Sequence, residues 1–389
     1  MAEPSSPPDG IVIVGSGLGG YTLAREVRRR DDAVPITLIT ADGGESYSKP
    51  MLSAAFAQGK SPADLVQKTA ALIASDLSIR VMTRHQVEAI HRDRQRLALR
   101  RPDGTGTEIG YGRLVLAIGA DPRPYRVEGS AAAGLFTVND LDDYIVWREA
   151  LAPASRVLLI GAGLIGCEFA NDLLTGGHGV TLVDPAPWPL GRLLPEELGT
   201  AMSTALGGAG ATLHLGRSVT AFAPGLATLD DGSQIRFDRA LTAIGLVPRT
   251  AMAAAAGLAV ARGIVVDRLL RSSDPAIFAL GDCVETASGP LPYIAPLLAE
   301  AKALAATLTG TETPLVLPAL PIVVKTPALP TTVCPPPPGA EGHWRVEGEG
   351  GDLKALFVAP DGGPLGFALC GKRAGEARAL AALMPPLLP

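Results

Sequence analysis

Two stretches decide the fold of this chain: IVIVGSGLGG at residues 11–20 and VLLIGAGLIG at residues 157–166. Each begins with four apolar residues, which are typical of a buried parallel strand, and continues into the glycine pattern G-x-G-x-x-G. A helical pattern follows each turn, and a second apolar strand follows each helix, at 36–40 and at 180–183. This order is that of a βαβ dinucleotide-binding unit. The sequence therefore predicts an α/β fold with two Rossmann-like dinucleotide-binding domains.

The three glycines of each pattern have different tasks. In the first copy, Gly15 permits the tight turn, Gly17 lets the backbone approach a pyrophosphate, and Gly20 lets the helix pack closely on the strand. The same three places in the second copy are held by Gly161, Gly163 and Gly166. The phosphates would then meet the free N–H groups and the positive dipole end of the following helix.

An acidic residue after the second strand of such a unit normally binds a ribose. In the second copy this residue is Asp184, which would bond the 2′-hydroxyl of NAD and repel the 2′-phosphate of NADP, so NADH is expected. The alternative is a simple Asx turn before Pro185. In the first copy the strand ends at Thr40 and the acid is displaced to Asp42, and either of these two could serve.

Two dinucleotides in one chain suggest one resident flavin and one exchanging nicotinamide, that is, FAD and NAD(H). Two further apolar strands, at 114–118 and 240–244, run into small-residue turns followed by proline, as at crossings between domains. A third, at 277–280, leads to Gly281 and Asp282, which could present a carboxylate to a ribityl hydroxyl or form an ordinary turn. From the ends of the first and third strands we expect four residues in the FAD site: Ala117, Gly119, Gly281 and Asp282.

The order of these segments predicts three domains. The FAD-binding domain is expected to be discontinuous, comprising residues 10–119 and 246–314, with the NADH-binding domain, 120–245, inserted between its halves. Residues 315–389 are expected to form a small α+β C-terminal domain, whose first part is rich in proline.

Composition excludes several other classes of protein. The chain has 389 residues, a formal net charge of −5 and only 4% aromatic residues, and it has no long basic run, so a nucleic-acid surface is not expected. Its four cysteines form neither C-x-x-C nor C-x4-C, so neither a metal site nor a dithiol is expected. It has neither an apolar run of spanning length nor a signal-peptide pattern, so we expect a cytoplasmic protein.

Several longer segments carry a family resemblance. The chain resembles the pyridine-nucleotide flavoprotein reductases of the glutathione-reductase structural class, and within them the bacterial rubredoxin reductases, over nearly its whole length. The segments that carry the resemblance are ITADGGESYSKPMLSAAF, FTVNDLDDY, VLLIGAGLIGCEFANDL, RGIVVDRLLRSSDPAIFALGDC and VVKTPALP. The third of these and the S-Y-S-K-P portion of the first are the most specific.

The resemblance implies roles for individual residues. The FAD pyrophosphate would be cradled by Gly15, Ser16, Gly17 and Leu18. Val87 would meet the adenine through its backbone, Asp282 would hold the ribityl chain, and Ile294 would meet the flavin ring from a helix start. The residues expected closest to the chemistry are Lys49 and Lys325 beside the flavin, and Glu168 where the nicotinamide stacks. Without that context, the two lysines would be solvated surface residues and Glu168 would complement the helix dipole.

Departures from related branches narrow the expected activity. Disulfide reductases of the class carry C-x4-C, and NADH oxidases a single redox cysteine, whereas this chain reads Leu52-Ser53-Ala54 at that place. The resemblance therefore implies an NADH:rubredoxin reductase, in which FAD takes a hydride from NADH and passes electrons directly to a small iron protein. Lys372 and Arg373 are candidates for docking an acidic carrier. The alternatives are an NADH-dependent ferredoxin, flavorubredoxin or nitrite reductase component, and an interaction flavoprotein like apoptosis-inducing factor.

Overall fold

A computed structural model of the chain describes residues 10–130 and 132–388. Its first unit is built on a parallel sheet of five strands in the order β20-β9-β1-β2-β5. The bounds of these strands, in that order, are Ile277–Ala279, Arg113–Leu116, Ile11–Val14, Ile36–Ile39 and Arg80–Met82. All four residues of β1 are buried, as the apolar run predicts. The sheet thus combines strands from the N-terminal part of the chain with β20, which comes much later in the sequence.

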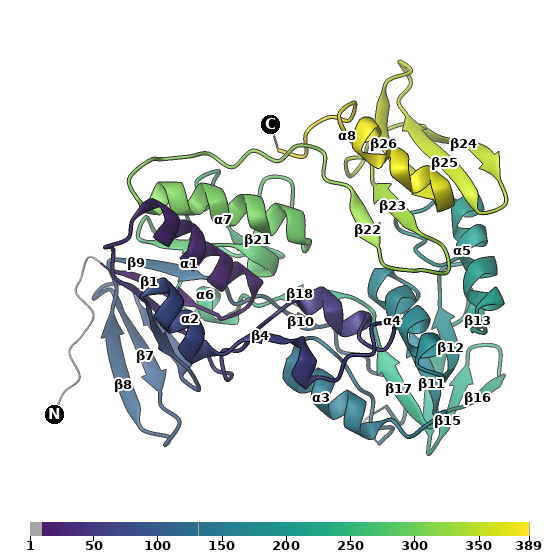
Figure 1. Ribbon diagram of the computed structural model, residues 1–389, viewed down its shortest axis with the longest axis horizontal. Helices are drawn as coiled ribbons and strands as arrows, with labels where there is room; N and C mark the ends of the chain where they lie inside the picture. The colour runs from purple at the N-terminus through teal and green to yellow at the C-terminus, as the bar shows by residue number, and fades with distance from the viewer. Residues whose placement is uncertain (1–9, 131, 389) are drawn as a thin grey trace.

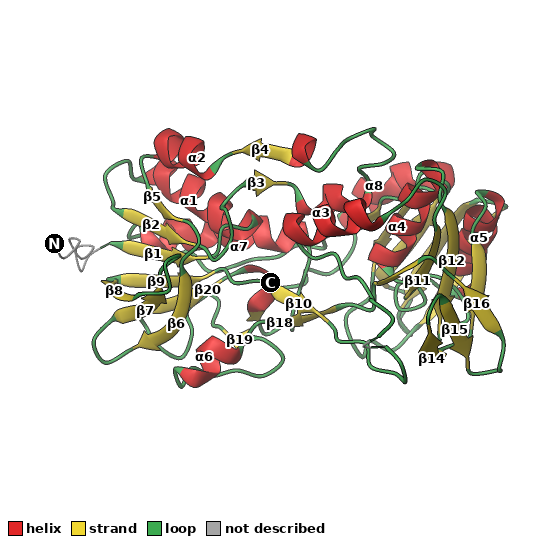
Figure 2. Ribbon diagram, turned by 90° about the horizontal axis from the view of Figure 1, so that it is seen from below, coloured by secondary structure: helices red, strands yellow, loops and turns green. Residues whose placement is uncertain are grey.

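Two layers cover this first sheet. Helices α1 (Leu18–Arg30), α2 (Ala70–Leu77) and α7 (Ile294–Leu308) lie on one side, with α1 and α7 side by side (Figure 1). The other side is covered by an antiparallel sheet of β6 (Gln86–His91), β7 (Arg96–Arg100) and β8 (Gly106–Gly110), as Figure 2 shows. The first glycine turn opens at the edge of the sheet where β1 gives way to α1.

The second unit repeats the plan. Its parallel sheet has the order β13-β12-β11-β17, with bounds Thr212–Leu215, Gly179–Asp184, Arg156–Ile160 and Arg239–Thr242. Three helices accompany it: α3 (Leu141–Ala150), α4 (Leu164–Thr175) and α5 (Glu196–Gly208). A smaller antiparallel sheet joins β14 (Val219–Ala223), β15 (Leu226–Leu229) and β16 (Gln234–Arg236). Two copies of one architecture explain why the glycine pattern occurs twice.

The chain passes between the two units twice, and the two passages pair with each other. They are β10 (Ala120–Pro122) and β18 (Leu246–Pro248), which form a two-stranded antiparallel ladder. Arg249 strengthens the ladder by pairing with Asp121 at 2.6 Å. The paired passages coincide with the strand-turn-proline segments that the sequence predicts as crossings between domains. The exact domain limits given there stay a prediction.

The C-terminal region is an antiparallel sheet of five strands in the order β22-β23-β26-β25-β24. Their bounds, in that order, are Ile322–Val324, Thr331–Cys334, Pro364–Cys370, Asp352–Val358 and His343–Glu349, and α8 (Ala377–Ala381) follows. The proline-rich stretch at its start is thus partly regular, since it supplies β22 and β23. The remaining short elements are β3 (Ser46–Tyr47), β4 (Val66–Lys68), α6 (Ala251–Ala255), β19 (Ile264–Val265) and β21 (Val284–Glu285).

One buried cluster ties three parts of the chain together. Leu52 and Ala55 come from the N-terminal segment, Trp147 and Phe169 from the helices of the second unit, and Val333 from the C-terminal sheet, and all are buried in the same apolar cluster. The segment around Leu52 therefore packs away from the unit that precedes it in sequence. Separately, none of the helices within 10–130 and 132–388 is long and apolar enough to cross a membrane.

Candidate functional site

The first glycine turn forms an open cradle over a helix end. Gly15 has φ +114°, and a Cβ there would lie 2.3 Å from the carbonyl oxygen of Ala117. A Cβ at Gly20 would lie 2.0 Å from the oxygen of Gly15, whereas a Cβ at Gly17 would meet nothing within 4 Å. Helix α1 starts at Leu18 without a side-chain cap, so its first N–H groups face this open space. The cradle therefore fits a pyrophosphate.

The second glycine turn has the same construction. Gly161 has φ +106°, and a Cβ there would lie 2.6 Å from the oxygen of Ala243. At Gly166 a Cβ would lie 1.8 Å from the oxygen of Gly161, and at Gly163 it would meet nothing within 4 Å. Helix α4 also begins without a side-chain cap. The chain thus offers two matching phosphate cradles, one at each parallel sheet.

A polar cluster lies beside the first cradle and brings both ribose candidates together. Ser16 Oγ and Thr40 Oγ1 are 2.9 Å apart, and both hydroxyls donate to Asp42 Oδ1, at 2.9 and 2.7 Å. The N–H of Gly44 donates to the same oxygen at 2.8 Å. Because these three bonds end on Oδ1, the other carboxylate oxygen, Oδ2, is left for a ligand hydroxyl among the contacts of the described chain. The displaced acid, Asp42, thus lies beside the first cradle, and its ribose role stays a prediction.

Asp184 forms the Asx turn that the sequence offered as one of two roles, and its ribose role stays a prediction. Its Oδ1 accepts the N–H of Ala186 at 2.7 Å, which is an Asx turn. Its Oδ2 accepts the N–H of Ala162 at 2.6 Å, so the carboxylate also fixes the second glycine turn. Each carboxylate oxygen can accept a second hydrogen bond, which leaves capacity for a ribose hydroxyl.

A buried polar group connects Lys49 with the crossing between the units. Lys49 Nζ donates to Asn139 Oδ1 at 2.7 Å, and Asn139 Nδ2 donates to the carbonyl oxygen of Ala120 at 2.9 Å. Burial lowers the pKa of Lys49, and the charge of Asp282 opposes this shift. Burial raises the pKa of Asp282, opposed by the charge of Lys49. The two groups share a poorly solvated site, and Asn139 was not among the predicted site residues, although it lies in the quoted FTVNDLDDY segment.

The remaining predicted residues of the first unit lie at its edges. Ala117 and Gly119 follow β9, and Gly119 has φ +70°. Val87 is a buried residue of β6. Ile294 is the first residue of α7, and its side chain is exposed by 43%. Exposure of such a large apolar side chain leaves it available to a ligand or a partner.

Glu168, Lys325 and Ser53 meet in one buried contact, although they come from three different parts of the chain. Lys325 Nζ lies 2.7 Å from Glu168 Oε2, and Ser53 Oγ donates to the same oxygen at 2.7 Å. Glu168 Oε1 accepts the backbone N–H of Lys325 at 3.0 Å. Lys325 Nζ also donates to Ser53 Oγ at 3.0 Å and to the carbonyl oxygen of Pro50. Glu168 is 1% exposed at its side chain and Lys325 33%, so this is a structural ion pair rather than two surface charges.

The same face of α4 holds two more residues that sequence reasoning missed. Asp172 accepts the N–H groups of Phe56 and Ala57, at 3.2 and 2.8 Å, and Asn171 Oδ1 accepts the N–H of Ala328 at 3.0 Å. Their positions three and four residues after Glu168 are the only signal that the sequence offers. A cavity of about 380 Å³ opens beside this face, lined by residues that include Ala54, Glu168, Asn171, Asp172 and Lys325.

The four cysteines are free and buried. Burial raises the pKa of the Cys283 thiol to about 12 and raises that of Cys167 as well. A thiol in this state is protonated at neutral pH and is a poor nucleophile. None of the four thiols is therefore suited to relay electrons or to exchange with a disulfide.

The basic pair expected to dock a carrier is already matched by acids. Lys372 Nζ lies 3.6 Å from Asp352, and Arg373 lies 2.7 Å from Glu376 and 3.8 Å from Glu347. Exposed pairs of this kind contribute little to stability, but they cancel the local charge. Acids therefore balance the local charge of this pair, and its docking role stays a prediction.

Comparison with known proteins defines the class. Residues 9–302 match the pyridine nucleotide-disulphide oxidoreductase family, and residues 314–384 match a rubredoxin binding C-terminal domain. The chain therefore belongs to the pyridine nucleotide-disulphide oxidoreductase family. The predicted fold class, two dinucleotide-binding units with a small C-terminal domain, is thereby confirmed.

Individual relatives point to one branch of that family. The Rubredoxin-NAD(+) reductase of Alcanivorax borkumensis is 44% identical over 384 residues, which cover 97% of this chain and 99% of the relative. The Nitric oxide reductase FlRd-NAD(+) reductase of Vibrio vulnificus is 38% identical, covering 95% of this chain and 96% of the relative. Among solved structures, the ferredoxin reductase for the CYP199A2 system from Rhodopseudomonas palustris has a TM-score of 0.87 at 27% identity, covering 97% and 95%. The resemblance to rubredoxin reductases is confirmed.

Gly163 and Gly166 of the second glycine turn should respond differently to an added methyl group. Gly163→Ala has room for its Cβ, so the protein should fold normally while the methyl group blocks the pyrophosphate and weakens NADH binding. Gly166→Ala clashes with backbone and should also lower the melting temperature. Thermal unfolding and NADH titration measure the two effects. Tight NADH binding by folded Gly163→Ala would show that no pyrophosphate lies there.

Replacing Asp184 tests the ribose assignment. Asp184→Ala should raise KM for NADH by roughly tenfold or more, because a charge-assisted hydrogen bond is worth about 1.5–3 kcal/mol, and should leave bound FAD unchanged. Steady-state kinetics and the FAD absorbance of the purified variant measure both. An unchanged KM would show that this carboxylate binds no ribose and that its bond to the glycine turn does not affect NADH binding.

Proposed function

We propose that this chain is an NADH-dependent flavoenzyme that passes electrons from NADH, through bound FAD, to a rubredoxin. The observation that carries the proposal is the contact between Lys325 and Glu168. Lys325 belongs to the region that matches a rubredoxin binding domain, and Glu168 stands on the helix that starts at the second phosphate cradle. The part of the chain expected to receive the carrier thus reaches into the place where a nicotinamide would lie.

The two cradles divide the cofactors between them. The first, with Ser16 and Asp42 beside it, binds FAD, and the second, with Asp184, binds NADH. When bound, FAD supplies the chemistry that couples a two-electron donor to a one-electron acceptor. The carboxylate at Asp184 excludes the additional phosphate of NADPH.

The residues around the proposed reaction site orient the cofactors and stabilise charge, and they do not transfer protons. Lys49 and Lys325 are held near the proposed flavin position by Asn139 and by Glu168 respectively, and their positive charges favour the uptake of electrons. Glu168 and Asp172 fix α4 against the N-terminal segment, which sets the position of the second cradle relative to the first. Ile294 and Asp282 are assigned to the flavin ring and its ribityl chain.

No thiol takes part in the proposed electron transfer from the flavin to the carrier. The position that carries a redox cysteine in other branches is Ala54, and the cysteines of the chain are buried thiols with high pKa values. Transfer must therefore be direct from flavin to carrier, across an interface of the small kind that redox partners form. The location we propose is the cytoplasm, where unpaired cysteines such as these are the rule.

A flavorubredoxin is the second candidate acceptor, because a full-length relative is named a Nitric oxide reductase FlRd-NAD(+) reductase. The higher identity to a Rubredoxin-NAD(+) reductase favours rubredoxin. The ferredoxin, nitrite reductase and interaction-protein alternatives are not favoured. The domain limits proposed from the sequence, 10–119 with 246–314, 120–245 and 315–389, are kept as the working division.

Carrier preference tests the proposed function. The purified holoenzyme is mixed with NADH and with a rubredoxin, a flavorubredoxin or a ferredoxin, and kcat/KM is compared. Rubredoxin should exceed ferredoxin by about a hundredfold or more, which corresponds to about 2.7 kcal/mol of transition-state discrimination. A higher value with flavorubredoxin would move the assignment to that carrier, and slow turnover with all three would refute it.

A further inference from the structure

A buried carboxyl on α7 stands directly behind the turn that carries Asp282. Glu300 is 2% exposed, and its Oε2 accepts the backbone N–H of Gly281 at 2.7 Å. Gly281 has φ +80°, and the turn it opens, Gly281–Cys283, follows β20. The carboxyl therefore fixes the backbone of the residue next to Asp282.

Close packing leaves this turn little freedom. A Cβ at Gly281 would lie 3.3 Å from Leu297, one helical turn before Glu300 on α7. A Cβ at Gly19 of α1 would lie 3.2 Å from Leu280 and 3.6 Å from Leu297. The first turn of α1, the turn at Gly281 and α7 are thus closely packed, so the backbone beside Asp282 and the first cradle has little room to move.

The charge of Glu300 has no cationic partner among the ion pairs of residues 10–130 and 132–388. The charged or titratable groups that act on it or its neighbour are Asp282 and Cys283 on the turn, and Lys49, which acts on Asp282 from the N-terminal segment. The first turn of α1 contains no charged residue. Burying a carboxylate in this way is unfavourable, and a glutamine could accept the same hydrogen bond without that cost.

We propose that Glu300 is a positioning residue of the FAD site: its carboxyl fixes the Gly281–Asp282 turn from behind, and its charge acts on Asp282 and on the ligand that Asp282 holds. This inference rests on the proposed FAD site. A negative charge at Glu300 disfavours a second negative charge nearby, so loss of its proton opposes electron uptake at the site. The charge beside the proposed flavin site therefore depends on pH through the protonation of Glu300.

The direction of the pH dependence follows from the surroundings of the carboxyl. Burial raises the pKa of Glu300 to about 7, the Gly281 N–H opposes this, and the charge of Asp282 adds to it. Because the pKa is higher in the folded than in the unfolded chain, the contribution of Glu300 to stability is fully present below its ordinary pKa and is lost as the pH rises through about 7. The charge change thus falls at neutral pH.

The test compares wild-type holoenzyme with Glu300→Gln, which keeps the hydrogen-bond acceptor and cannot titrate. Flavin absorbance and midpoint potential are followed from about pH 6 to pH 8, with the thermal midpoint of FAD release as a second readout. The wild type should show a transition near pH 7 in all three, and Glu300→Gln should show none while retaining FAD. At about pH 8 the variant should release FAD at a higher temperature and have a higher potential than the wild type.

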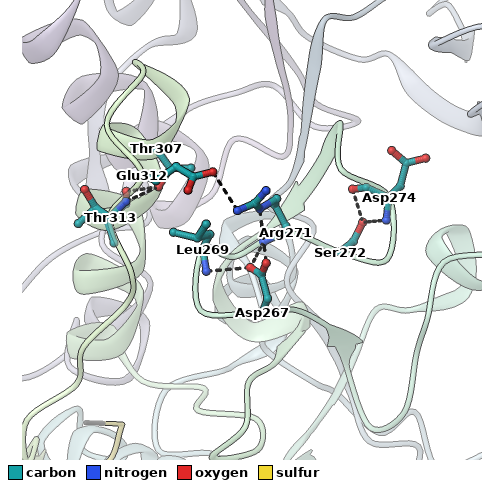
Figure 3. A network of polar contacts seen from close by, with 9 residues as sticks. Asp267, Leu269, Arg271, Ser272, Asp274, Thr307, Glu312 and Thr313 are labelled. Atoms are coloured by element: carbon teal, nitrogen blue, oxygen red, sulfur yellow. Dashed lines mark hydrogen bonds and ion pairs between the residues drawn. The ribbon is translucent and has the colours of Figure 1, made fainter.

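The control is Glu312→Gln, which removes the same charge at an exposed place just beyond α7. Glu312 pairs with Arg271 at 3.1 Å, and Arg271 is also held by Asp267 at 3.4 Å (Figure 3). This variant should keep the wild-type transition.

Several outcomes would overturn the proposal. A wild type with no flavin transition near pH 7 would do so even if Glu300→Gln failed to fold, and so would a transition that persists in Glu300→Gln. A wild type that binds no FAD would refute the proposed function as well, so the two failures are distinguishable.

Discussion

The ion pair between Lys325 and Glu168 is the constraint on which the rest of the site depends. It joins a lysine of the C-terminal region to a glutamate of the second unit, and Ser53 of the N-terminal segment bonds to both. Removing one partner of a fully buried pair costs about 3–5 kcal/mol, and the cost here should be smaller because the Lys325 side chain is one-third exposed. Three regions that are distant in sequence are therefore held at one point, and that point lies beside the second phosphate cradle.

Helix α4 connects the Lys325–Glu168 ion pair with the proposed NADH site. Its N-terminus forms the second cradle, Glu168 in its second turn holds Lys325, and Asn171 and Asp172 bind the backbones of the C-terminal and N-terminal segments. One helix therefore carries the proposed NADH cradle, holds Lys325 and bonds to the backbone of the C-terminal region. Because the cysteines, including Cys167 of α4, are buried thiols, this arrangement serves direct transfer to a carrier rather than a thiol relay.

The glycine turns could be predicted from the sequence because the six consecutive residues of the G-x-G-x-x-G pattern determine the turn and the helix end, although the carbonyls packed against Gly15 and Gly161 belong to the distant Ala117 and Ala243. Asp184 was found in a similar way, because it ends the second strand of its βαβ unit, and its ribose role stays a prediction. Asn139, Asn171 and Asp172 escaped prediction because their partners are distant; Asp172 bonds to Phe56 116 positions away, and Asn171 bonds to Ala328 157 positions away. Glu168 and Lys325 were found only through family resemblance, for the same physical reason. The docking role of Lys372 and Arg373 stays a prediction, since Asp352 of β25 pairs with Lys372 and Glu376, three positions further on, pairs with Arg373.

The central claim is that the Lys325–Glu168 contact makes the C-terminal region part of the site where NADH meets flavin. The test of this claim is anaerobic stopped-flow mixing with NADH, in which the flavin absorbance is followed. It compares three proteins: the wild type, Lys325→Met, and the double variant that carries Lys325→Met together with Glu168→Gln. Lys325→Met should slow flavin reduction about tenfold or more and lower the melting temperature; the double variant should recover the melting temperature but not the rate, since the cation is still missing. Wild-type rate and melting temperature in Lys325→Met would contradict the account.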